Sequence, residues 1–87
     1  MADRGDNVKK YMVVEHFKQG SIHTIYDRLA VNGRMLPEGL YYLNSWVNKD
    51  NNVCFQLMET DQPDLFNDWF EFWSELIDFE LYPIDNR

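Results

Sequence analysis

The stretch "LYYLNSWVNKDNNVCFQLMET", residues 40–60, decides the fold that the sequence predicts. Two runs rich in aromatic and β-branched residues flank the polar segment "NKDNN", residues 48–52. Such runs around a short polar turn are typical of two antiparallel strands joined as a hairpin. Because this hairpin lies in the middle of the chain, the elements before and after it determine the topology.

The N-terminal side of the hairpin predicts one strand and one helix. "YMVVEHF", residues 11–17, has the composition of a strand. A helix is predicted over residues 21–33 from apolar side chains at helical spacing, namely Ile22, Ile25, Tyr26 and Leu29. Ser21 is expected to cap this helix by accepting a hydrogen bond from a free backbone amide, and Gly33 to end it in the left-handed conformation.

The C-terminal side repeats this pattern in reverse order. A second helix is predicted over residues 62–77, with Pro63 in its first turn and one apolar face made of Leu65, Phe66, Trp69, Trp73 and Leu76. "FELYPI", residues 79–84, follows as a strand, and Pro83 indicates that this strand lies at a sheet edge.

The resulting order of strands and helices is βαββαβ, which indicates an α+β, ferredoxin-like fold. This fold is a four-stranded antiparallel sheet with two helices on one face. The 87 residues predict one such domain over residues 11–87, and the polar, aperiodic residues 1–10 predict a disordered tail.

Strand alternation predicts which side chains meet the helices and which occupy the other side of the sheet, here called the open face. The helix side is expected to hold Tyr11, Val13, Phe17, Tyr41, Leu43, Val47, Val53, Phe55 and Leu57, with Glu15 at its rim. The open face is expected to hold Met12, Val14, Leu40, Tyr42, Trp46, Cys54 and Met58, mixed with His16, Asn44 and Gln56. A face this apolar is rarely left in water, so a homodimer is predicted.

Three strings carry a family resemblance: "YMVVEHF", "GRMLPEGLYYLNSW" and "CFQLMETDQPDLFNDW". They resemble a group of short bacterial proteins of unknown function in the dimeric α/β barrel superfamily, over nearly all of residues 11–84. The resemblance implies the same ferredoxin-like fold and pairing of two sheets face to face. It implies no reaction, because relatives that share a fold often differ in activity.

Charge and composition exclude several classes of partner and place the protein in the cytoplasm by default. The net charge is −7, which opposes binding to nucleic acid or to an anionic membrane surface. The single cysteine, Cys54, cannot form an internal disulfide. His16 and His23 lie on different elements without paired cysteines, and phosphate and dinucleotide fingerprints are missing, so neither a metal nor a cofactor is predicted.

The candidate site centres on His16, a histidine on a strand that can serve as a general base or orient a ligand. Its predicted neighbours on the open face are Asn44, Trp46 and Gln56, with Cys54 as a buried, unactivated thiol. Arg34 can hold a carboxylate ligand or pair with a local acid. Glu15 points away from His16, so it is expected to end the strand or to bind Arg34. The alternative interpretation is that the same residues fill a dimer interface.

The sequence therefore predicts a homodimer with a small-molecule pocket, between sheet and helices or at the dimer interface, and leaves open whether it is an enzyme. One alternative is a non-catalytic structural or interaction module. A further alternative is an enzyme similar to the cofactor-free monooxygenases or isomerases, which rests on the fold resemblance alone.

Overall fold

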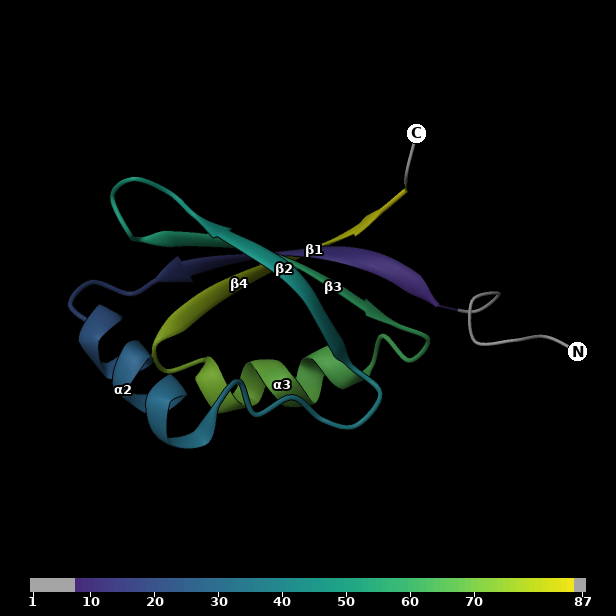
Figure 1. The fold of residues 1–87 in the computed structure, drawn as a ribbon, viewed down its shortest axis with the longest axis horizontal. Helices are drawn as coiled ribbons and strands as arrows, with labels where there is room; N and C mark the ends of the chain where they lie inside the picture. Colours follow the sequence, from purple (N-terminus) through teal and green to yellow (C-terminus); the bar gives the residue numbers. More distant parts are fainter. Residues whose placement is uncertain (1–7, 86–87) are drawn as a thin grey trace, which may run out of the picture.

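The computed structural model describes residues 8–85 and confirms the predicted order of elements (Figure 1). The strands are β1 (Lys9–Phe17), β2 (Tyr41–Val47), β3 (Val53–Thr60) and β4 (Ile77–Ile84). The helices are α2 (Ile22–Asn32) and α3 (Leu65–Trp73). Of the predicted tail, residues 1–7 lie outside the described residues, whereas Lys9 and Lys10 already belong to β1.

All four strands form one antiparallel sheet in the order β2-β3-β1-β4, and both helices lie on the same side of it (Figure 1). The predicted hairpin is confirmed, because β2 and β3 are neighbours. Pro83 lies in the edge strand β4, also as predicted. The chain thus has the α+β, ferredoxin-like fold, and one face of its sheet is left without helices.

The predicted faces are right for β1 and wrong for β3. Met58 is fully buried in the core with residues of both helices, and Cys54 and Gln56 are also buried. Phe55 is 40% exposed on the open face. The prediction had assigned the more apolar set, Val53, Phe55 and Leu57, to the helices. The register decides otherwise, because it pairs Tyr11 with Met58 and places the two side chains on the same face.

A β-bulge in β2 changes the predicted faces of that strand. The register shifts between Tyr42, which pairs with Met58, and Asn44, which pairs with Leu57. An extra residue in one strand interrupts the alternation of side chains. Tyr42 therefore joins the helix side, contrary to the prediction, and Tyr41 the open face, while Val47, Asn44 and Trp46 lie on their predicted sides. Leu40, which precedes the strand, is buried rather than open.

The core lies between the sheet and the helices and is rich in aromatic rings. Phe66 and Trp69 of α3 are almost completely buried, as the predicted apolar face of this helix requires. Tyr11 meets Phe66 edge to face at 5.1 Å between ring centroids, and Phe70 stacks on Phe79 at 4.2 Å. Large aromatic side chains compensate in part for the small core of a short chain.

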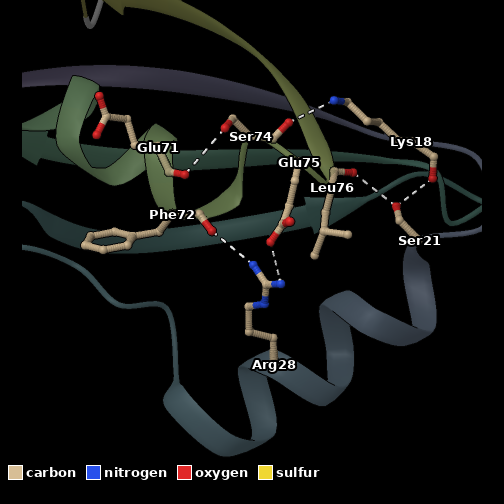
Figure 2. Close-up of polar contacts among 8 residues, drawn as sticks. All are labelled: Lys18, Ser21, Arg28, Glu71, Phe72, Ser74, Glu75 and Leu76. Carbon is tan, nitrogen blue, oxygen red and sulfur yellow. Dashed lines mark hydrogen bonds and ion pairs between the residues drawn. The ribbon is translucent and has the colours of Figure 1, made fainter.

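Polar contacts join α2 and the segment before it to the end of α3 and the turn that leads to β4 (Figure 2). The prediction that Ser21 caps α2 through its side chain is wrong. Its hydroxyl instead donates to the carbonyl oxygens of Lys18 and Leu76. Arg28 donates to the carbonyl of Phe72 at 3.1 Å and to the carboxylate of Glu75 at 2.7 Å. These contacts hold α2 against the end of α3, and α2 forms one wall of the cavity described next.

Candidate functional site

A cavity of about 190 Å³ lies between the helix side of the sheet and both helices. Its polar lining comes from four different parts of the chain: Glu15 of β1, Arg34 of the loop after α2, Ser45 of β2, and Cys54 and Gln56 of β3. Its apolar lining includes Phe17, Ile25, Trp69, Trp73 and Ile77. A mostly apolar cavity with a few convergent polar groups is the usual form of a small-molecule site.

Glu15 is the buried carboxyl group of this cavity, with 8% of its surface exposed. It lies at the centre of the sheet, where β1 pairs it with Cys54 of β3 and Phe79 of β4. Burial raises the pKa of the Glu15 carboxyl to about 7, against the smaller opposing effects of a hydrogen bond from the Cys54 thiol and of the Arg34 charge. Glu15 can therefore accept or release a proton near neutral pH.

The thiol of Cys54 is a hydrogen-bond donor in this site and not a nucleophile. Burial raises its pKa to about 12, and the adjacent negative charge of Glu15 adds to this effect. Because the thiolate is the reactive form of cysteine, the thiol is unreactive at neutral pH. The sequence-based interpretation of Cys54 as buried and unactivated agrees with this environment.

Arg34 is held at the cavity by two tryptophans of α3. The indole nitrogens of Trp69 and Trp73 both donate to the Arg34 carbonyl oxygen, at 2.8 and 3.1 Å. These bonds satisfy two indole donors inside the core and fix a turn in which Met35 has a positive φ of 58°. The Arg34 guanidinium lies over the ring of Tyr42, 3.7 Å from its centroid, in a cation–π contact.

Gln56 and Ser45 complete the polar lining on neighbouring strands. Gln56 is buried, and its amide nitrogen lies 3.3 Å from the Met58 sulfur, a weak acceptor. Ser45 shares a hydrogen bond of 2.6 Å with the hydroxyl of Tyr42, the residue beneath the Arg34 guanidinium. The bulge in β2 is what brings Ser45 and Tyr42 to the same side of the sheet.

The five residues that the sequence predicted as one site lie on two faces of the sheet. Arg34 and Gln56 line the cavity. His16, Asn44 and Trp46 lie on the open face and do not line it. The predicted partner of His16, Gln56 or Asn44, is wrong, because the side chain that its imidazole contacts is Glu80 of β4. The prediction had grouped these residues because it assigned Gln56 of β3 to the same face as His16.

Glu80 is the centre of a polar cluster on the open face that also contains His16 and Tyr82. The Tyr82 hydroxyl and the His16 imidazole bond to different oxygens of the Glu80 carboxylate. Both contacts, that of Tyr82 first, lower the pKa of Glu80. This cluster is exposed and separate from the cavity.

Glu15 is the functional candidate that sequence reasoning missed, because it had been assigned to the rim of the helix side. It does not end its strand, since β1 continues to Phe17. Against the larger effect of burial, the charge of Arg34 lowers the pKa of Glu15. The expected binding of Glu15 to Arg34 is not seen, however, because the two side chains form no ion pair within 4.0 Å. The signal was present in the sequence: Glu15 shares its parity with Tyr11, Val13 and Phe17, and a lone carboxylate in such an apolar set is unusual.

Within residues 8–85, no helix has the length and apolar character needed to cross a membrane. No group of three or more histidine, cysteine, aspartate or glutamate side chains in the same range is placed to hold a metal ion.

Residues 9–85 match the family model described as "Domain of unknown function (DUF3303)". No curated protein matches the sequence.

Proposed function

The chain belongs to the DUF3303 family of domains of unknown function, and we propose that it binds a small organic molecule in the cavity between its sheet and helices. The observation that carries this proposal is the position of Glu15, a carboxyl group buried in the wall of an otherwise mostly apolar cavity. Burying an ionisable group lowers stability unless it is compensated. A ligand that uses the carboxyl group explains why it lies there.

The proposal includes a homodimer formed through the open face, as in a dimeric α/β barrel. Trp46 and Phe55 are cross-strand neighbours on this face and are 50% and 40% exposed. Tyr82, on the edge strand β4, is half exposed on the same face. A second copy is the proposed occupant, since a sheet face without helices can meet its own copy across a twofold axis. The free cysteine supports a reducing, cytoplasmic location.

A second candidate function is an enzyme without a cofactor that moves a proton within the bound molecule, as isomerases do. It is favoured by the pKa of Glu15, about 7, because a general base is most effective when its pKa is near the working pH. The remaining alternative, a non-catalytic interaction module, becomes the conclusion if the cavity binds nothing.

The test is ligand-induced thermal stabilisation with a panel of one-ring compounds: benzoate, benzamide, phenol, aniline and toluene. Ser45→Leu places a larger apolar side chain in the cavity, whereas Asn44→Leu makes a matched change at the preceding residue, on the open face. We expect at least one compound to raise the melting temperature of the wild type and of Asn44→Leu but not of Ser45→Leu. The proposal is contradicted if a compound stabilises Ser45→Leu and Asn44→Leu equally. It is also contradicted if no compound stabilises the wild type.

A further inference from the structure

The charges that face the cavity consist of one acid and one base. From β1 comes the carboxyl group of Glu15, and from the loop after α2 the guanidinium of Arg34. Cys54 of β3 is a neutral thiol, and the titratable side chain from α2 is the phenol of Tyr26. The lining residues of α3 and β4, Trp69, Trp73 and Ile77, carry no charge. An ionised Glu15 therefore balances Arg34, and the cavity is neutral overall.

Arg34 offers donors that the described part of the chain does not use. Among residues 8–85, the guanidinium has no hydrogen-bond acceptor and no carboxylate within 4.0 Å, and its contact is the face of Tyr42. A guanidinium presents a planar fork of N–H groups that matches the two oxygens of a carboxylate. The backbone of Arg34 is held by the two indoles that donate to its carbonyl oxygen, and its guanidinium by the ring of Tyr42.

We propose that the cavity binds the conjugate base of a small weak acid together with one proton, with Arg34 facing the negative charge and Glu15 holding the proton. This inference rests on the proposed function, because it names the chemical class of the molecule in that cavity. The reason is charge balance. A monoanion beside both Arg34 and an ionised Glu15 would leave one unpaired negative charge in an apolar cavity, whereas a protonated Glu15 leaves none.

The proton balance is the same for either route of entry. If the ligand enters as the neutral acid, its O–H bond breaks, the proton forms a new O–H bond on the Glu15 carboxylate, and the electron pair stays on the ligand. If the ligand enters as the anion, Glu15 takes the proton from solvent. In both cases the complex contains a neutral Glu15, an anionic ligand and a cationic Arg34.

The size and walls of the cavity restrict this acid to about one ring. An apolar cavity of about 150 Å³ is sufficient to bind benzene in another protein, so about 190 Å³ accommodates one ring with a small polar substituent. Trp69 and Trp73 present aromatic surface to such a ring. Benzoate is therefore a suitable probe, and benzamide is its neutral counterpart of the same shape.

The experiment is calorimetric titration of benzoate at pH 8 in phosphate and in Tris, two buffers whose ionisation enthalpies differ. Since the pKa of Glu15 is about 7, about nine-tenths of the free protein is ionised at pH 8. We expect uptake of about 0.9 proton per benzoate, about half a proton at pH 7, and none in the Glu15→Gln variant. Arg34→Met should weaken benzoate binding at least tenfold and leave benzamide binding within twofold. Lys49→Met, which removes a positive charge from an exposed turn, should change neither.

The outcomes separate this inference from the proposed function. Benzoate binding without proton uptake, proton uptake that persists in Glu15→Gln, or benzamide binding as tight as that of benzoate overturns the inference and leaves a ligand cavity. Failure of benzoate to bind also overturns it, while the proposed function is then decided by the remaining compounds of the thermal panel.

Discussion

Glu15 and Cys54 occupy paired positions on the neighbouring strands β1 and β3, and both side chains enter the same cavity. The thiol donates a hydrogen bond to the carboxyl group and opposes the rise of its pKa, while the negative charge of the carboxylate raises the pKa of the thiol. The pair thus separates two roles. Glu15 can exchange a proton near neutral pH, and Cys54 stays protonated.

Stability should fall as the pH rises from about 4.5 to about 7. The folded-state pKa of Glu15 is about 7, against 4.5 for an unperturbed glutamate, so the unfolded state loses its proton first. The contribution of Glu15 is complete below pH 4.5 and is lost by pH 7, at roughly 1.4 kcal/mol per pKa unit or roughly 3 kcal/mol in all. Urea unfolding of the wild type and of Glu15→Gln at several pH values measures it as a difference.

Glu15→Gln should lack this decline, while Glu38→Gln, which removes a carboxylate from an exposed loop position, should keep it. The comparison between variants is needed because a carboxylate whose pKa is lowered in the folded state, such as Glu80, makes stability rise with pH instead. Parallel curves for the wild type and Glu15→Gln would show that Glu15 is not buried as described.

Cys54 should react slowly with iodoacetamide in the folded protein. Its pKa of about 12 leaves very little thiolate at pH 8, and the side chain is almost fully buried. Mass spectrometry should show alkylation at least tenfold slower than in urea-unfolded protein. Glu15→Gln should speed the reaction at pH 9, because it removes the adjacent negative charge. Equal rates in folded and unfolded protein would contradict the buried environment.

Arg28→Lys should lower the free energy of unfolding by about 1 kcal/mol, and Glu75→Gln by less than about 0.5 kcal/mol. The carboxylate of Glu75 is 68% exposed, so its ion pair with Arg28 is screened by water. Arg28 also donates to the Phe72 carbonyl (Figure 2), and its guanidinium lies 5.6 Å from the centroid of the Trp73 ring. Lysine cannot make both contacts, because it lacks the planar fork of donors. Equal losses in urea unfolding would assign the whole effect to the ion pair.

Phe55→Glu should convert the proposed homodimer into a monomer. The substitution introduces a charge near the centre of the open face, on the interior strand β3. Val31→Glu is the matched control, since Val31 is 80% exposed on α2, away from that face. Light scattering should give the mass of two chains for the wild type and the control, and of one chain for Phe55→Glu. A wild-type mass of one chain at micromolar concentration rules out the dimer.

His16→Leu should leave ligand binding in the cavity unchanged within about twofold. His16 lies on the opposite face of the sheet from Gln56 and contacts Glu80. Gln56→Leu, by contrast, removes a polar group from the cavity wall and should weaken the binding of polar ligands. Thermal stabilisation by the compounds that bind the wild type compares the two variants. A loss of binding in His16→Leu would restore the sequence-based interpretation of this histidine.

The order of elements was determined by the sequence itself, because it depends on local patterns. The change of apolar period from two to 3.6 and back marks β1, α2, the β2–β3 hairpin, α3 and β4 without any long-range information. The faces of β1 were also predicted correctly, with Tyr11, Val13 and Phe17 on the helix side and His16 on the other. The prediction of two helices on one face then follows from the topology.

The composition of the cavity was decided by the tertiary structure. In β3 hydrophobicity favours Phe55 over Gln56 for the helix side, but the pairing of β3 with β1 places Gln56 there. In β2 a bulge between Tyr42 and Asn44 shifts the alternation, and composition does not locate it. The pKa of Glu15 depends on burial beneath α2 and α3, and α3 is distant from Glu15 in sequence. Register, bulges and desolvation arise from contacts between segments, and for that reason Arg34 and Gln56 could be predicted as candidates but their meeting with Glu15 could not.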